Sequence, residues 1–161
     1  MTKSYLIKIF FLIVSVTACS SSSEESFFEK LDLKDLSGND ITLDDIEGKL
    51  AFINLWATYC KPCLKEMPSI ERAKTILEKE GYVFIAVSDE EQSKIQKFVD
   101  RFDYSFQFAQ YELGIGGLGV YALPASYIVN DKGEMLYKHV GAKEWDEEEN
   151  IKLFRSYLTD K

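Results

Sequence analysis

The chain has 161 residues, of which 46% are hydrophobic and 14% aromatic, enough for the core of one globular domain but not of two. This hydrophobic content, with 29% of charged residues, excludes a disordered chain and a low-complexity fibre. Nineteen basic against 27 acidic residues give a net charge of −8 at pH 7, which argues against nucleic acid as a partner, because phosphate contacts need a basic surface.

The first nineteen residues have the pattern of an export signal. Two lysines precede an unbroken apolar run, residues 9–14, which is far shorter than the roughly 18 residues that indicate a membrane-spanning helix. Residues 16–19, Val-Thr-Ala-Cys, then resemble the lipobox of bacterial lipoproteins, in which the cysteine is acylated and becomes the mature N-terminus. We therefore expect a signal peptide over residues 1–18 and a lipid on Cys19. The alternative is an ordinary signal that is cut near an unmodified cysteine.

Serine and glutamate alone make up residues 20–26, which have nothing apolar to bury and are typical of a flexible tether. We expect a lipid-anchored tether over residues 19–26 and one globular domain over residues 27–161. The domain would then lie in the bacterial cell envelope, in the periplasm or at the cell exterior. Such a compartment is oxidising, so disulfides can form and persist there.

A β-hairpin is predicted at the start of the domain, where residues 28–33 and 41–43 flank the turn sequence Ser-Gly-Asn-Asp at 37–40. Residues 50–56 are almost continuously apolar, as in a strand that is covered on both faces.

A helix and a second buried strand follow. From Cys63 on, apolar residues recur at helical spacing until Gly81 ends the pattern, and we expect Pro68 to kink the helix rather than abolish it. Residues 82–87 are again apolar, so strand, helix and strand predict a right-handed parallel crossover.

The remaining chain predicts two more helices and three more strands. Asp89 is expected to cap a helix that buries four apolar side chains. These are Ile95, Phe98, Val99 and Phe102. Residues 105–109 are predicted to form a short edge strand, and residues 126–129 and 134–140 flank an Asn-Asp-Lys-Gly turn that indicates an antiparallel pair. With a last helix over residues 146–158, the elements predict an α/β fold: a mixed sheet with helices on both faces.

Cys60-Lys61-Pro62-Cys63 lies where the first buried strand ends and the first helix begins. The free amides and the partial positive charge of a helix N-terminus favour a thiolate over a thiol at the first cysteine. The second cysteine lies one turn further on, close enough to form a disulfide with the first. Lys61 adds a positive charge, and Pro62 suits the first helical turn because it has no amide hydrogen to leave unpaired. This pattern indicates redox chemistry.

Other interpretations of the sequence motifs are weaker. Half of a zinc site needs two further ligands, and the chain offers only His139 and Cys19 as further histidine or cysteine ligands. A merely structural disulfide would close too short a loop to stabilise the fold appreciably. A single histidine builds no relay, so we expect His139 to be a half-exposed strand residue. Residues 114–119 match GxGxxG, but a strand follows too soon for the helix of a dinucleotide site, and a mobile loop beside the active site is expected.

The segment from Phe52 to Pro68, Phe-Ile-Asn-Leu-Trp-Ala-Thr-Tyr-Cys-Lys-Pro-Cys-Leu-Lys-Glu-Met-Pro, resembles the active-site segment of thioredoxin-like proteins of the TlpA/ResA type. The resemblance extends over nearly all of residues 28–161 in the order of motifs and elements. It implies a thioredoxin-like fold and a membrane-tethered thiol-disulfide oxidoreductase that needs no cofactor. Two positions depart from the family pattern: Tyr59 stands where tryptophan is usual, and Lys61 where proline or glutamate is common.

The resemblance also implies roles for single residues. Cys60 would attack a substrate disulfide, Cys63 would resolve the mixed disulfide, and Glu66 would serve the second thiol as a buried proton acceptor, although helical periodicity alone would leave it in solvent. Asn54 occupies the strand position at which cytoplasmic thioredoxins carry a buried acid. The Leu123–Pro124 bond is expected to be cis. The residues expected to bind the substrate are Trp56, Lys61, Pro62, Leu123 and Pro124.

By the same resemblance the protein would reduce disulfides of exported proteins, such as apocytochromes c during cytochrome c biogenesis, with electrons from a membrane thiol carrier. We expect a monomer and no bound metal. One alternative is a copper-binding chaperone of the Sco type on the same fold, which the cysteine spacing and the position of His139 disfavour. The other is a peroxiredoxin-like peroxidase with antioxidant activity.

Overall fold

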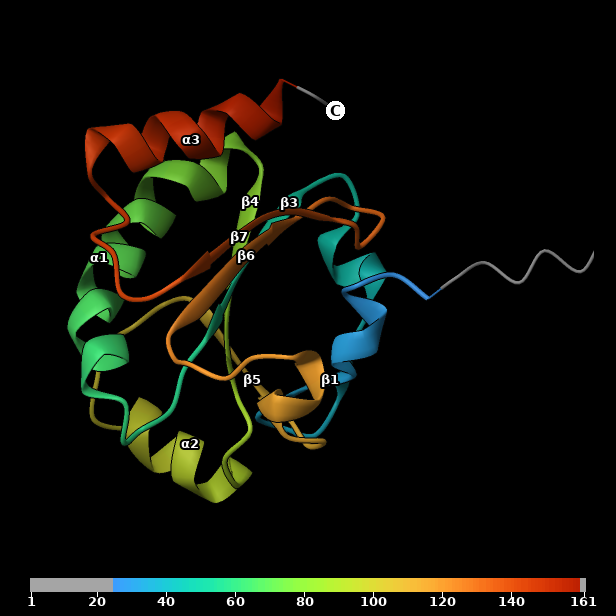
Figure 1. Cartoon of the computed structure of the whole chain (residues 1–161), viewed down its shortest axis with the longest axis vertical. Helices are drawn as coiled ribbons and strands as arrows, with labels where there is room; N and C mark the ends of the chain where they lie inside the picture. Colours follow the sequence, from blue (N-terminus) through green and yellow to red (C-terminus); the bar gives the residue numbers. More distant parts are fainter. Residues whose placement is uncertain (1–24, 160–161) are drawn as a thin grey trace, which may run out of the picture.

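The computed structural model describes residues 25–159, which form a seven-stranded sheet with helices packed against it (Figure 1). The predicted signal peptide, Cys19 and most of the predicted tether lie outside the described residues. The strand order across the sheet is β2-β1-β5-β4-β3-β6-β7. The strands are β1 (Leu33–Asp35), β2 (Asp40–Ile41), β3 (Leu50–Leu55), β4 (Tyr82–Ser88), β5 (Gln107–Tyr111), β6 (Ala125–Val129) and β7 (Met135–Val140).

The sheet is mixed, as predicted. β3, β4 and β5 run parallel, whereas β6 pairs antiparallel with both β3 and β7. All six residues of β3 are buried, because this strand lies inside the sheet and both of its faces are covered. The prediction of an edge strand near residues 105–109 is wrong: β5 lies between β4 and β1, since the short N-terminal strands extend the sheet beyond it.

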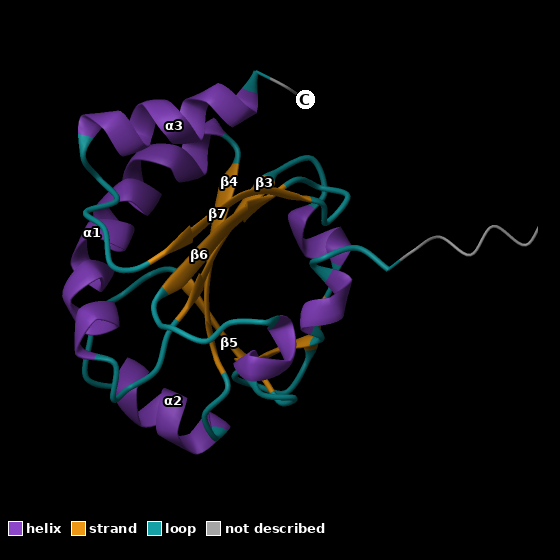
Figure 2. Ribbon diagram, viewed as in Figure 1, coloured by secondary structure: helices purple, strands orange, loops and turns teal. Residues whose placement is uncertain are grey.

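Helices cover both faces of the sheet, but all three α-helices pack on one of them (Figure 2). They are α1 (Lys61–Leu77), α2 (Gln92–Val99) and α3 (Glu148–Leu158). The crossovers through α1 and α2 lead across the sheet in the same direction, so one handedness places both helices on one face. The other face carries three 3-10 helices. These are η1 (Glu29–Leu31), η2 (Leu43–Ile46) and η4 (Ile115–Leu118).

The N-terminal segment differs from the expected hairpin in its length. Only β1 and β2 pair, with Leu33 opposite Ile41. Residues 29–31 form η1 instead of a strand, and η2 begins at Leu43. A capping box explains the start of η2, because the Thr42 side chain and the carboxylate three residues later satisfy each other's backbone amides.

Two predictions about α2 are wrong. The helix begins at Gln92 after Glu91, whose side chain makes no capping hydrogen bond, and the Asp89 carboxylate instead accepts the Ile115 N–H at 3.1 Å. Phe102 is 47% exposed, because α2 ends at Val99 and the face of the helix does not continue to residue 102.

Other predicted elements are confirmed. The first helix, α1, continues through Pro68, whose side chain is exposed, and the short η3 (Glu78–Glu80) follows before Gly81. Gly81 has a φ of 104°, a left-handed conformation that glycine adopts without a steric penalty. Strands β6 and β7 form the predicted antiparallel pair. Among residues 25–159, no helix has both the length and the apolar character that a membrane crossing requires.

Candidate redox site

The two cysteines of the CxxC motif lie at the start of α1 and are joined by a disulfide. β3 ends at Leu55, and a tight turn, in which the Cys60 N–H donates to the Ala57 carbonyl at 3.0 Å, leads to the helix. Cys60 is the N-cap residue, and its sulfur accepts the Cys63 N–H at 3.3 Å. The Cys60 sulfur therefore occupies the site where a helix N-terminus stabilises negative charge.

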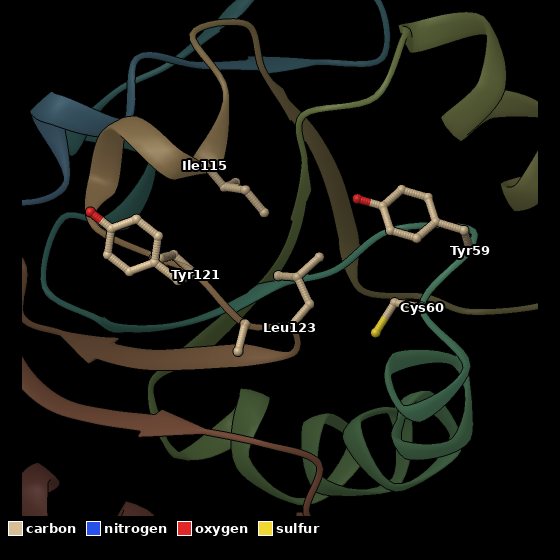
Figure 3. A pocket seen from close by; sticks show the side chains of 7 residues that line it. Tyr59, Cys60, Ile115, Tyr121 and Leu123 are labelled. Carbon is tan, nitrogen blue, oxygen red and sulfur yellow. The ribbon is translucent and has the colours of Figure 1, made fainter.

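The two sulfurs have different access to solvent. Cys60 is 8% exposed and lines a surface cavity of about 380 Å³ whose lining side chains are mostly apolar, whereas Cys63 has no exposed surface. In Figure 3 the side chains of Tyr59, Ile115 and Leu123 project into the space beside Cys60. The complete lining is Tyr59, Cys60, Ile115, Val120, Tyr121, Ala122 and Leu123. Cys60 is therefore accessible from this cavity, and Cys63 is not accessible from solvent.

The Leu123–Pro124 peptide bond is cis, as predicted. It directly precedes β6, in which Ala125 pairs with Leu55 at the end of β3, and so it lies on the same edge of the sheet as the cysteines. Leu123 is half-buried and lines the cavity, whereas Pro124 is buried and its carbonyl accepts the Gly141 N–H at 2.9 Å. Leu123 is therefore the more accessible of the two to a substrate.

The other three residues that we expect to bind the substrate differ in their exposure to solvent. Lys61 and Pro62 are exposed on the first turn of α1, next to Cys60. Trp56 has no exposed surface, and its ring packs against Phe98 and Phe108 at centroid distances of 4.6 and 5.6 Å. This burial contradicts a direct substrate contact by Trp56, which instead supports the core below the site.

Glu66 is buried, with 1% of its surface exposed. Its Oε1 accepts a hydrogen bond from Asn54 Nδ2 at 2.8 Å, and its Oε2 accepts hydrogen bonds from the Lys143 N–H at 3.0 Å and from Trp145 Nε1 at 3.1 Å. Burial raises the pKa of Glu66 above its ordinary value, although the three hydrogen bonds act in the opposite direction. A carboxylate with a raised pKa is suited to accept a proton near neutral pH.

Two features connect Glu66 to a role in proton transfer. It lies three residues after Cys63 on α1, one helical turn away, and both side chains are buried. A surface cavity of about 210 Å³ also borders the glutamate. The cavity is lined by Lys65, Glu66, Ala142, Lys143 and Glu144.

Glu90 is not singled out in the sequence analysis, yet it is a second buried carboxylate near the cysteines, with 9% of its surface exposed. Its oxygens accept the Thr58 N–H at 2.5 Å and the Thr58 hydroxyl at 2.9 Å, and it forms an ion pair with Lys94. Burial alone would raise the pKa of Glu90, but the hydrogen bonds from Lys94 and Thr58 outweigh it and lower the pKa. One signal could have found it: Glu90 follows β4, whose carboxyl end adjoins that of β3 in the parallel sheet.

The sequence also draws attention to His139 and to the glycine-rich segment, residues 114–119. His139 is half-buried on β7, as predicted, and its ring lies 5.8 Å from that of Trp145. Within the described part of the chain, no group of three His, Cys, Asp or Glu side chains could hold a metal ion. In the glycine-rich segment, Ile115 belongs to a short 3-10 helix and lines the cavity over Cys60, which places this segment beside the redox site.

Comparison with known proteins identifies relatives of most of the described domain. The AhpC/TSA family model matches residues 26–138. Thiol-disulfide oxidoreductase ResA of Halalkalibacterium halodurans is 38% identical over 113 residues, which are 68% of this chain and 64% of ResA. Thioredoxin-like protein YneN of Bacillus subtilis is 36% identical over 113 residues, which are 68% of this chain and 66% of YneN. The match thus spans slightly less than two thirds of the length of these relatives.

A solved structure supports the thioredoxin-like fold. The solution structure of an uncharacterized thioredoxin-like protein from Porphyromonas gingivalis is 28% identical, with a TM-score of 0.67, over 84% of this chain and 95% of that protein. The thioredoxin-like fold and the resemblance to ResA-type proteins are therefore confirmed. On the extent of the family match, this chain belongs to the AhpC/TSA family.

Proposed function

We propose that this protein is a thiol-disulfide oxidoreductase that acts on disulfides of exported proteins. The observation that carries the proposal is the asymmetry of the cysteine pair at the start of α1: Cys60 opens onto a surface cavity, and Cys63 is fully buried. The names of the relatives, ResA among them, support the same activity.

In the proposed reaction, the Cys60 thiolate attacks one sulfur of a substrate disulfide. A mixed disulfide forms and the other substrate sulfur leaves as a thiolate, which takes up a proton. The Cys63 thiol then loses its proton and attacks the Cys60 sulfur, which releases the second substrate thiol and leaves Cys60 and Cys63 oxidised. The Cys63 N–H that donates to Cys60 stabilises the thiolate in the reduced protein.

Glu66 is proposed to accept the proton of Cys63 in the resolving step. Three hydrogen-bond donors hold the carboxylate in one orientation, and its raised pKa brings it closer to the pKa of a thiol. The proton then leaves Glu66 for solvent through the cavity beside it. Lys61 and Pro62 follow Cys60 on the first turn of α1, and Leu123 lines the cavity beside it; all three are proposed to contact the substrate, with Pro124 positioning Leu123.

The proposed location is the bacterial cell envelope, with residues 1–18 as a signal peptide, a lipid on Cys19 and the thioredoxin-like domain over residues 27–161. The sequence of residues 16–19 and the polar segment after it support this anchor. We propose the reductive direction, with electrons from a membrane thiol carrier and exported disulfide proteins such as apocytochromes c as substrates. A monomer without a bound cofactor suffices for this chemistry.

Equilibrium with glutathione tests the proposed activity. The protein is incubated at graded ratios of reduced to oxidised glutathione and quenched with an alkylating reagent, and its mass is measured by mass spectrometry. In a separate assay, turnover is followed with insulin as the disulfide substrate. We expect a reversible two-electron transition of Cys60 and Cys63 and catalysed insulin reduction by dithiothreitol. A pair that excess dithiothreitol leaves oxidised, or insulin reduction no faster than with Cys60→Ser, contradicts the proposal. Copper titration and peroxide consumption by the reduced protein test the two alternatives.

The lipid anchor has its own test. In a bacterial host that processes lipoproteins, the wild-type chain should enter the membrane fraction and carry the mass of an acylated Cys19. Cys19→Ala should leave the membrane fraction and retain its redox activity. Membrane association of Cys19→Ala with an unchanged mass of the processed form would contradict the anchor.

A further inference from the structure

Tyr59 forms one wall of the cavity over Cys60, although 69% of the residue's surface is exposed. An exposed aromatic ring on a surface turn has several rotamers open to it, so a fixed wall requires contacts that hold it. The Nζ atom of Lys94 lies 5.7 Å from the centre of the Tyr59 ring. This cation over the aromatic face is one such contact.

Glu90 connects Lys94 to the turn that carries Tyr59. Its carboxylate forms an ion pair with Lys94 and accepts both the N–H and the hydroxyl of Thr58, the residue before Tyr59. Glu90 is itself fixed, since its N–H donates to the Ser88 hydroxyl at 3.2 Å and its carbonyl accepts from Gln110 at 3.1 Å. One buried carboxylate thus holds both the backbone below the ring and the cation above it.

We infer that Glu90 is a positioning residue for substrate selection: through Thr58 and Lys94 it fixes Tyr59 as a wall of the cavity, and the cavity then favours disulfides with a large apolar side chain beside the reacting cysteine. The inference rests on the proposed function and deepens it. The lining supports this substrate class, because Ile115, Leu123 and the tyrosine ring offer apolar surface directly beside the Cys60 sulfur (Figure 3).

The size of the preference follows from the burial of apolar surface. Full burial of a large apolar side chain in the transition state accelerates a reaction by about tenfold or more. The cavity over Cys60 is open to solvent and buries only part of such a side chain, so we expect a preference of roughly tenfold. The preference requires a rigid wall, since a mobile ring gives up part of the contact.

Two short peptides test the inference. They differ in one residue beside the cysteine, phenylalanine or glycine, and each cysteine carries 5-thio-2-nitrobenzoate as a disulfide. Reduced protein releases the coloured thiol in a single turnover, and the ratio of the two second-order rate constants reports the preference. Wild type should favour the phenylalanine peptide roughly tenfold. Glu90→Gln should lower the ratio to about twofold or less by slowing the phenylalanine peptide, with the glycine peptide within about twofold of wild type.

Matched variants separate positioning from general damage. Glu91→Gln makes the same change at the next residue, whose side chain makes no capping hydrogen bond, and should keep the wild-type ratio. Tyr59→Ala should abolish the preference, and Tyr59→Phe should retain it. Lys94→Met, which leaves the Thr58 contacts to Glu90 in place, should give an intermediate ratio.

Several outcomes overturn the inference. If Glu90→Gln slows both peptides by the same factor, the residue supports the fold and selects nothing. If wild type reacts with both peptides equally, the cavity has no preference for apolar side chains. If wild type releases no thiol from either peptide and also fails with insulin, the proposed activity itself fails, which is a different result from a loss of preference.

Discussion

Glu66 and Glu90 are both buried, both accept a backbone N–H, and both lie close to the cysteine pair, yet their pKa values are shifted in opposite directions. Burial raises the pKa of Glu66, whereas Lys94 and Thr58 lower that of Glu90 despite its burial. The difference has two sources: Glu66 is more deeply buried than Glu90, and Glu90 has a cation as a partner. No lysine or arginine within residues 25–159 forms an ion pair with Glu66.

The comparison separates two tasks of a buried carboxylate. A carboxylate paired with a cation stays charged and can hold other groups in place, as Glu90 holds Thr58. A buried carboxylate without a cation gains and loses a proton more readily near neutral pH. This contrast fits the proposed roles, in which Glu90 acts on the Cys60 side of the disulfide by orienting a substrate and Glu66 acts on the Cys63 side by accepting a proton.

The largest expected effect comes from Glu66→Gln, which removes the titrating group on the Cys63 side. Loss of a positioned acid–base group lowers rates by about 10²–10⁴-fold, and we expect a decrease of this order in the turnover of insulin. The pH profile of turnover should also flatten, because the group with the raised pKa is gone. Alkylation of reduced Cys60 should remain as in wild type. Superimposable pH profiles of variant and wild type would mean that Glu66 transfers no proton.

The opposite pKa shifts predict opposite pH dependences of stability. The raised pKa of Glu66 contributes stability that is present at low pH and lost as the pH rises through the folded-state pKa. The lowered pKa of Glu90 contributes stability above its ordinary range that is lost as the pH falls. Denaturant unfolding at several pH values between roughly 4 and 7 should therefore show Glu90→Gln losing about 1–3 kcal/mol at neutral pH and less in acid.

Glu66→Gln should show the reverse trend in the same measurement, gaining on wild type as the pH rises. An amide can be accommodated, because Asn54 Oδ1 is buried without a hydrogen-bond partner among the described residues and can accept from it if the Asn54 amide turns over. Parallel pH dependences of the two variants would refute the contrast between the carboxylates.

The smallest expected effect comes from Lys94→Met, which makes the surroundings of Glu90 more like those of Glu66. About half of the Lys94 side chain is exposed, so solvent screens the ion pair, and we expect a loss of about 0.5 kcal/mol at neutral pH. The pKa of Glu90 should rise, which carbon-detected NMR of the carboxylate can follow. A Glu90 pKa that stays where it is in wild type would show that Thr58 alone keeps the carboxylate charged.

The sequence predicted what depends on local pattern. The buried run of β3, the helix that starts at the CxxC motif and the β6–β7 pair each follow from apolar periodicity and turn residues within one short segment. The position of β5 could not be predicted in this way, because its neighbour β1 comes from the other end of the domain and is only three residues long.

The same distinction between local pattern and long-range packing applies to the residues of the candidate site. Cys60 and Cys63 are evident from spacing and position, whereas the burial of Glu66 was expected only from resemblance, since its partners Lys143 and Trp145 are more than 70 residues away. The prediction that Trp56 contacts the substrate is wrong for a related reason. A tryptophan before the motif can face either the surface or the core, and only the packing of α2 against the sheet decides between them.

The trapping of mixed disulfides tests most directly whether the two cysteines differ as proposed. Cys60→Ser and Cys63→Ser are each incubated with an oxidised disulfide protein such as insulin, and the products are separated without reductant and mapped by mass spectrometry. We predict that Cys63→Ser accumulates a disulfide between Cys60 and the substrate, because the resolving thiol is missing, and that Cys60→Ser accumulates none, because Cys63 has no exposed surface. Equal trapping by both variants, or trapping by Cys60→Ser alone, would contradict the account.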